Sequence, residues 1–271
     1  MMGDIRMPEK LILWMESLKW GEHHDRWHFE RRWDFWFYFA EHGDADMKQT
    51  AKELIEYAQK QKWKRAELQE GQAGNGMDFL MMHRAMLRLI QEKFPEYQNL
   101  IRGWKTPPTD PKDLIDPVLD GKAFEPAKVE GIKIIENNFA DFASDDAYGL
   151  FIETNIHPLP NNPANRNPDG RLGVHNYLHN RWTDPASPIN LGDPKVNIFN
   201  ERFWKLHGWI DRQWGHFRKA KGLSDTDPSY LSLLAQYKHM MSGHLHPMFN
   251  VLEKETGVLK RPAAFSRFFQ F

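Results

Sequence analysis

The chain has 271 residues, of which 41% are hydrophobic and 27% are charged, a composition typical of a soluble globular protein. Its formal net charge of −1 creates no bulk attraction to a polyanion, so we expect no nucleic-acid partner. The absence of cysteine excludes disulfides, thiolate metal sites and a cysteine nucleophile.

The first residues contain only one short apolar run, LILWM at 11–15, which is flanked by charged residues. Such a run is shorter than the apolar core of a signal peptide and much shorter than a membrane span. We therefore expect a protein without a membrane segment and with a cytoplasmic location.

Three stretches in the first third of the chain show the hydrophobic spacing of amphipathic helices. Residues 9–42, 44–69 and 75–94 repeat apolar side chains three to four positions apart, with charges between them. The second stretch begins with acidic and ends with basic residues, as the helix dipole favours. We expect each stretch to be helical.

The pattern becomes irregular after residue 103. Residues 103–130 are rich in Pro and Gly, which predicts a long crossover. The remaining pattern predicts, in order, a possible helix at 132–144, a short strand at 148–153, a helix containing HNYLHNRW, a loop at 183–197, and helices at 200–222 and 227–257. Gly222 is placed to end the first of these last two helices. Together these elements predict a single mainly helical domain over residues 1–271, with long irregular loops and an aromatic tail at 258–271.

Histidines recur in two similar sets along the predicted helices. His24 and His28 are four residues apart, as are His175 and His179, so each pair shares one helical face. A single histidine on a later helix follows each pair: His83 in FLMMHRAML and then His207 in FWKLHGWID.

Three imidazoles from two helices can face one metal ion, and two such sets can face each other in the core of a helix bundle. Neutral imidazole suits copper, zinc, iron and nickel. No obvious Asp/Glu bridging motif occurs at these positions, which argues against a di-iron carboxylate site. Spacing alone therefore predicts a metal cage and leaves the metal open.

Two segments resemble the type-3 copper proteins, the family of tyrosinases, catechol oxidases and haemocyanins. HNYLHN, ASPINLGDP and FWKLHGWIDRQW are similar in order to the family's second copper motif, and FLMMHRAMLRLIQEKFPE is similar to a helix that carries a ligand of the first copper. The resemblance covers about residues 75–95 and 173–216.

The resemblance implies a four-helix-bundle di-copper centre with His24, His28, His83, His175, His179 and His207 as ligands of two copper ions. It implies a copper-dependent oxidoreductase that uses O2 to oxidise, and potentially to hydroxylate, a phenolic, o-diphenolic or o-aminophenolic small molecule. Asn176 would orient a water molecule or a neighbouring ligand. Asp211 would set the helix of His207, and Glu153 is a candidate for a carboxylate that holds a water molecule.

The first copper motif departs from the pattern of most tyrosinases. The stretch before FLMMHR contains Gln69 and Gln72 where those relatives have a histidine. The string HHDRWH instead matches the spacing of relatives that place an HxxxH pair on an earlier helix, although its separation from His83 is long. The first site is therefore either of this second type or incomplete.

Other interpretations remain open. His24 and His28 could belong to a solvated face, and His83 could be an ordinary core histidine. The chain could be a non-catalytic type-3 protein that binds O2, a degenerate scaffold with one metal such as zinc, or a helical interaction module. A Phe of the tail 258–271 could plug the metal pocket, but packing against the helices is the simpler expectation.

Overall fold

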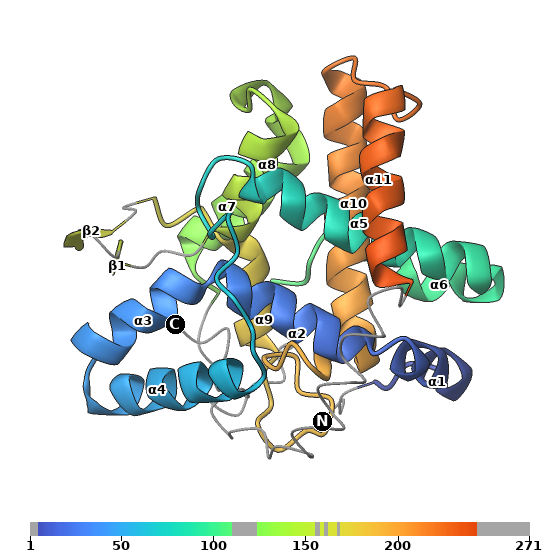
Figure 1. Cartoon of the computed structure of the whole chain (residues 1–271). Helices are drawn as coiled ribbons and strands as arrows, with labels where there is room; N and C mark the ends of the chain where they lie inside the picture. The colour runs from blue at the N-terminus through green and yellow to red at the C-terminus, as the bar shows by residue number, and fades with distance from the viewer. Residues whose placement is uncertain (1–4, 110–123, 155–157, 160–161, 167–168, 243–271) are drawn as a thin grey trace.

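The computed structural model describes residues 5–109, 124–154, 158–159, 162–166 and 169–242. Within these residues the chain is mainly helical, which confirms the prediction of a mainly helical fold (Figure 1). The helices are α1 (Glu9–Ser17), α2 (Trp20–Arg31), α3 (Trp33–His42), α4 (Ala45–Lys60), α5 (Asn75–Lys93), α6 (Gln98–Ile101), α7 (Pro126–Asn137), α8 (Asp145–Glu153), α9 (Val174–Arg181), α10 (Glu201–Ala220) and α11 (Pro228–Met241). Two short antiparallel strands, β1 (Pro158–Leu159) and β2 (Asn162–Arg166), form a small hairpin. No helix in the described part of the chain is long and apolar enough to cross a membrane.

The predicted helix over 9–42 is divided into α1, α2 and α3. Lys19 adopts a left-handed backbone conformation with φ 53°, which ends α1 and turns the chain into α2. Arg32 separates α2 from α3 with φ −108° and ψ 18°. Hydrophobic spacing continues across both breaks, so the sequence pattern alone does not reveal them.

The helices α3 and α4 form a hairpin with its own hydrophobic cluster, at the lower left of Figure 1. Asp44 caps α4, and its side chain accepts a hydrogen bond from the amide of Met47 at 2.9 Å. The helix predicted over 44–69 ends at Lys60, because the following residues fold back toward Glu30 and Arg31. The amides of Ala66 and Glu70 donate to the carbonyls of those two residues.

The predicted strand at 148–153 is wrong, since these residues belong to α8. Ser144 caps this helix by accepting from the amide of Ala147, and acidic residues occupy its first turn. Gly149 of α8 lies directly against Gly76 of α5, where an added Cβ would lie 2.2 Å from the Gly76 carbonyl oxygen. The absence of side chains at Gly76 and Gly149 lets the backbones of α5 and α8 approach closely.

The other predicted helices agree more closely with the structure. α5 matches the stretch 75–94, and α10 matches 200–222, with Gly222 at φ +68° after its end. α7 begins earlier than the predicted helix at 132–144 and overlaps the end of the predicted crossover, whose residues 110–123 lie outside the described part. The tail 258–271 also lies outside it.

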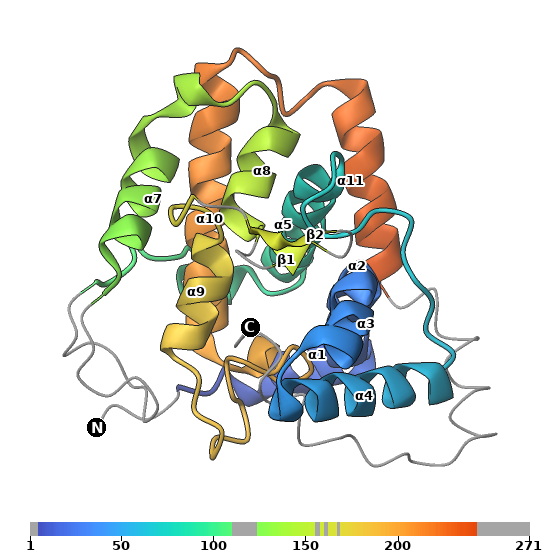
Figure 2. The ribbon, with the colours of Figure 1, turned by 90° about the vertical axis from the view of Figure 1, so that its left-hand side faces the viewer.

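The main hydrophobic core lies between α1, α2, α5 and the helices from α7 to α11. Figure 2, turned from Figure 1, shows α8, α9 and α10 on one side of this core and α2 and α3 on the other. Many of its largest fully buried side chains are tryptophans, including Trp20, Trp204, Trp209 and Trp214. Aromatic rings of this size bury large apolar areas and so fix the spacing of the helices.

Candidate metal centre

Four helices bring all six candidate histidines into the buried interior. α2 contributes two, α5 one, α9 two and α10 one, and every one of these side chains is at most 4% exposed: His24, His28, His83, His175, His179 and His207. Buried imidazoles need hydrogen-bond or metal partners. The interpretation of His24 and His28 as a solvated face is therefore wrong.

The first group joins α2 to α5. The ring centroids of His24 and His28 lie 4.6 Å apart, and that of His83 lies 5.6 Å from His24 and 6.0 Å from His28. One ring nitrogen from each of the three lies within 4.8 Å of the others. The HHDRWH pair is thus close enough to His83 for all three to hold one ion.

The second group joins α5 to α9 and α10. The rings of His83 and His207 stack with centroids 4.1 Å apart, and one ring nitrogen from each of His83, His175 and His207 lies within 4.8 Å of the others. The His179 ring is 4.6 Å from that of His175 and 5.4 Å from that of His207. His28 and His175 have nearly parallel rings 6.2 Å apart, so the two groups form one continuous cluster.

Backbone carbonyls fix the tautomer of four of the rings. A carbonyl oxygen only accepts hydrogen bonds, so each Nδ1 in contact with one carries the proton and leaves the lone pair on Nε2. The four contacts run from His24 to Pro194 at 2.7 Å, His83 to Phe79 at 2.9 Å, His179 to Leu191 at 2.8 Å and His207 to Phe203 at 2.7 Å. This is the arrangement that prepares an imidazole to bind a metal through Nε2.

The Nε2 atoms approach one another as ligands of shared ions would. Nε2 of His24 lies 3.1 Å from Nε2 of His28, and Nε2 of His175 lies 3.1 Å from Nε2 of His207. Two nitrogens that each lie about 2.0–2.1 Å from one ion are separated by roughly 3–3.5 Å. Nε2 of His83 is buried without a hydrogen-bond partner among the described residues. A metal cation would satisfy these converging lone pairs, so the residues fit a metal.

Burial keeps the cluster uncharged. Loss of solvation lowers the pKa of His24 to about 4 and that of His179 to about 3, and it lowers the pKa of the other four histidines well below the usual range. Neighbouring imidazoles add to the effect, because two protonated rings would repel. The rings are therefore neutral near pH 7, which is the form that binds metals.

A second buried cluster of polar residues lies beside the histidines. Arg32 forms a buried ion pair with Glu70 and donates from Nη2 to Oδ1 of Asn176 at 2.9 Å. Nδ2 of Asn176 donates to the backbone carbonyl of Glu153. Asn176 thereby ties the helix of His175 to the end of α8 and to Arg32. Its predicted role toward a water molecule or a ligand remains a prediction.

Glu153 contributes a second buried carboxyl group to this polar cluster, in addition to that of Glu70. Its side chain is buried, and its Oε2 has no hydrogen-bond partner among the described residues. Burial, with a further contribution from Glu70, raises its pKa well above the usual range. A carboxyl group in such a position is a candidate for acid–base chemistry.

The other residues noted in the sequence connect structural elements. Asp211 forms an ion pair with Arg84, which follows His83, and so joins α10 to α5. Gln69 donates from its side chain to the carbonyls of Glu30 and Ala66, which fixes the loop before α5. These contacts give Asp211 and Gln69 structural roles, because they connect elements that surround the histidine cluster.

Sequence reasoning missed the groups that orient the rings. The carbonyls of Leu191 and Pro194 come from one loop and hold His179 and His24, which belong to different groups. No side-chain pattern marks a carbonyl acceptor. A signal did exist for His83 and His207, because each follows a Phe by four residues and donates to the carbonyl of that Phe.

Comparisons with family models, curated proteins and solved structures gave no match to this chain.

Proposed function

We propose that this chain is a tyrosinase-like copper oxidoreductase that uses O2 to oxidise a phenolic, o-diphenolic or o-aminophenolic small molecule. The observation that carries the proposal is the convergence of six buried, neutral imidazoles from four helices, with the Nε2 atoms of paired rings 3.1 Å apart. The histidines that converge are the six that the resemblance to type-3 copper proteins implies as ligands.

The donor set favours copper among the metals that imidazole binds. The two groups contain histidine alone, without a carboxylate or a thiolate. Imidazole ligation supports both common oxidation states of copper, whereas iron and manganese sites usually include carboxylates. His24, His28 and His83 would hold one ion, and His175, His179 and His207 would hold the other. Bound copper would supply the electron transfer with O2 that the side chains cannot perform.

The chain itself would orient the ligand rings, exclude water from the cluster and exchange a proton with the substrate. The carbonyl contacts at Nδ1 hold the rings in one tautomer and orientation, and burial excludes water from the cluster. A phenol is more reactive after it loses its proton. We assign the exchange of that proton to the buried carboxyl group of Glu153, which lies beside Arg32 and Asn176 and whose pKa is raised by burial.

Copper loading followed by metal analysis tests this proposal. We expect two copper ions per chain, a new absorption band when O2 is added to the reduced protein, and oxidation of a catechol. His24→Ala and His207→Ala should each lower the copper content to about one ion and abolish oxidation. His42→Ala is the matched control, because His42 is half exposed and lies outside the cluster. Wild-type protein that retains no copper would refute the proposal.

One observation favours a second candidate, a scaffold that holds a single metal such as zinc. His83 belongs to both geometric groups. If His83 binds one ion together with His175 and His207, His24 and His28 have no third histidine ligand and would hold no second ion. In that case His24→Ala and His28→Ala would leave the stoichiometry at one ion per chain. A decrease from two ions in either variant would exclude the single-metal scaffold.

A further inference from the structure

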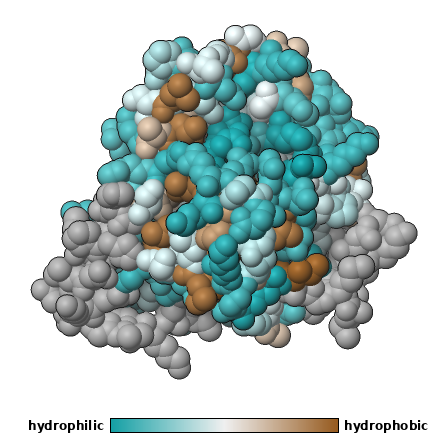
Figure 3. All heavy atoms as spheres, turned by 90° about the vertical axis from the view of Figure 1, so that its right-hand side faces the viewer, coloured by the Kyte–Doolittle hydropathy of each residue, from teal (hydrophilic) through white to brown (hydrophobic). Residues whose placement is uncertain are grey.

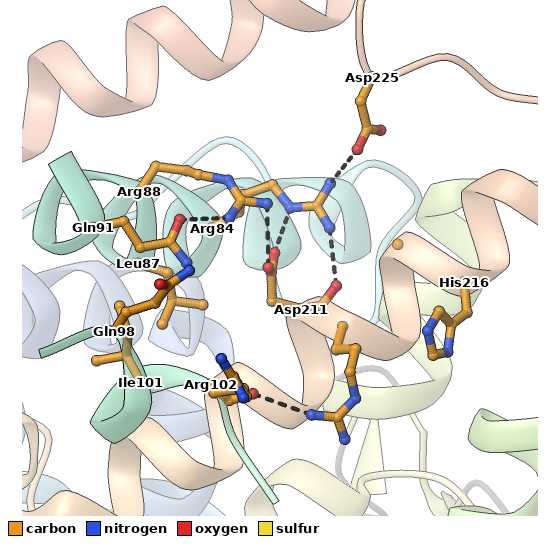
Figure 4. Close-up of a pocket in the computed structure, with 13 residues that line it drawn as sticks. Arg84, Leu87, Arg88, Gln91, Gln98, Ile101, Arg102, Asp211, His216 and Asp225 are labelled. Atoms are coloured by element: carbon orange, nitrogen blue, oxygen red, sulfur yellow. Dashed lines mark hydrogen bonds and ion pairs between the residues drawn. The ribbon is translucent and has the colours of Figure 1, made fainter. Parts of the chain in front are cut away.

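A pocket outside the histidine cluster is lined by four arginines. It has a volume of about 330 Å³ and lies between α5, α6 and α10. Arg84 and Arg88 come from α5, Arg102 from the residue after α6, and Arg212 from α10. Figure 4 shows Arg84 and Arg88 directed toward Asp211. None of these residues belongs to the proposed metal centre.

The two carboxylates of the pocket already pair with Arg84 and Arg218. Asp211 pairs with the fully buried Arg84, and it reaches Arg88 only at 3.5 Å. Asp225 pairs at 2.6 Å with Arg218, which does not line the pocket, and lies 3.9 Å from Arg84. Most of the negative charge in the pocket is therefore balanced before Arg88, Arg102 and Arg212 are considered.

These three arginines leave the pocket with an excess of positive charge. Arg212 donates to the backbone carbonyls of Arg102, Trp104 and Lys105, and neither it nor the exposed Arg102 forms a salt bridge within the described chain. Burial lowers the pKa of Arg212, because its charge is only partly solvated there. A concave surface with such an excess attracts anions, and guanidinium groups bind oxyanions through paired N–H donors.

Gly215 is a second, independent feature of the pocket. It lies inside the long helix α10, where a glycine costs roughly 0.5–1 kcal/mol relative to alanine. Gly208 on the same helix has a packing reason, because its Cβ would lie 2.2 Å from the carbonyl oxygen of Ile101. A Cβ at Gly215 would meet nothing within 4 Å. Close packing therefore does not explain this glycine, which lines the pocket at a point where an added Cβ would meet open space.

We propose that this pocket binds a small molecule with a phosphate group, held by Arg88, Arg102 and Arg212. Its volume lies at the lower end of the range for small-ligand sites, which fits a phosphate ion or a small phosphate ester. Leu87 and Ile101 supply apolar contacts for an organic part. A bound phosphate would join α5 to α10, and the site is independent of the proposed copper chemistry.

The surface around these helices offers little support for a macromolecular partner. The face in Figure 3 is mostly hydrophilic, and its hydrophobic residues form small separate patches. Protein interfaces usually require a larger continuous area. A small ligand in the pocket is therefore the occupant that the charge and volume favour.

Isothermal titration calorimetry of the full chain with inorganic phosphate and with phenyl phosphate tests the site. We expect saturable binding with a Kd of about 1 mM or tighter for at least one of them. Tighter binding of phenyl phosphate would identify an organic phosphate as the ligand, and equal binding would identify the free ion. The absence of saturable binding of both below about 10 mM would overturn the proposal.

Two kinds of variant separate a built site from general attraction of anions. Arg102→Gln removes a charge and Gly215→Phe fills the pocket without changing the charge, and each should weaken binding by about tenfold or more. Arg6→Gln, at an exposed arginine elsewhere, and Gly215→Ala should keep the wild-type Kd within about twofold. Unchanged binding in both Arg102→Gln and Gly215→Phe would contradict the site. Circular dichroism of each variant establishes that it is folded.

Discussion

At the scale of single residues, the cluster combines fixed tautomers with suppressed charge. Contacts from Nδ1 to backbone carbonyls determine which nitrogen of His24, His83, His179 and His207 presents a lone pair. Burial then keeps the rings neutral. Among the described residues, His83 is the histidine that both geometric groups share.

We predict that His83→Ala disturbs both ions, whereas His24→Ala disturbs mainly the first. The ring of His83 stacks on His207 at 4.1 Å and lies 5.6 Å from His24, so its removal leaves a gap between the two groups. Copper content after loading should fall below one ion per chain in His83→Ala and to about one in His24→Ala. Equal losses in the two variants would show that the effect of His83 is confined to the first ion.

The neutral histidines also predict how stability depends on pH when no metal is bound. The pKa of His24 is about 4 in the folded chain and about 6.5 in the unfolded chain, so the unfolded state binds more protons between these values. The free energy of unfolding should therefore be greatest above pH 6.5 and fall as the pH drops toward 4, with similar contributions from His179. Urea unfolding with a chelator present measures this. Stability that is constant or increases from pH 6.5 to 4.5 would contradict the buried, neutral cluster.

At the scale of elements, the cluster depends on the loop at 183–197 packing against α2. Gly21 of α2 lies so close to this loop that an added Cβ would be 2.2 Å from the carbonyl oxygen of Lys195. The preceding carbonyl, of Pro194, holds the ring of His24. The close approach of α2 to the loop thus lets the Pro194 carbonyl, which precedes α10 in the chain, orient the ring of His24.

We predict that Gly21→Ala lowers the free energy of unfolding by about 1–3 kcal/mol and weakens copper retention at the first group. The new methyl group would displace the loop and with it the Pro194 carbonyl. Gly215→Ala is the matched control, since it is also a helical glycine but has open space around its Cβ, and it should be neutral or slightly stabilising. Urea denaturation and copper analysis measure both effects. Equal stability of the two variants would refute the close packing at Gly21.

The N-terminus of α5 is likewise held in place by a residue of another helix, α8. Asp146, in the first turn of α8, accepts hydrogen bonds from the amides of Gly74 and Met77 at 2.9 and 3.0 Å. We predict that Asp146→Ala lowers the free energy of unfolding by about 1–2 kcal/mol through loss of this cap. Asp44→Ala removes a cap of the same chemistry from α4, outside the helices of the cluster. If copper retention falls only in Asp146→Ala, the effect is due to the position of α5.

At the scale of the whole molecule, local sequence patterns predict the residues of the centre better than its surroundings. Four-residue spacing selects the histidine pairs, and hydrophobic periodicity selects α5 and α10, because both are properties of a single helix. The sequence pattern does not reveal the breaks at Lys19 and Arg32, and it predicts a strand where α8 forms. These features depend on contacts such as Arg32 with Glu70 and Gly76 with Gly149, which join residues far apart in the chain. Such contacts leave no local pattern to read.

The most direct test of the central claim is a crystal structure of the copper-loaded protein, with diffraction measured at the copper absorption edge. We expect two anomalous peaks inside the chain, one beside the Nε2 atoms of His24 and His28 and one beside those of His175 and His207. A single peak shared through His83, or copper bound only at the surface, would contradict a centre with two coppers.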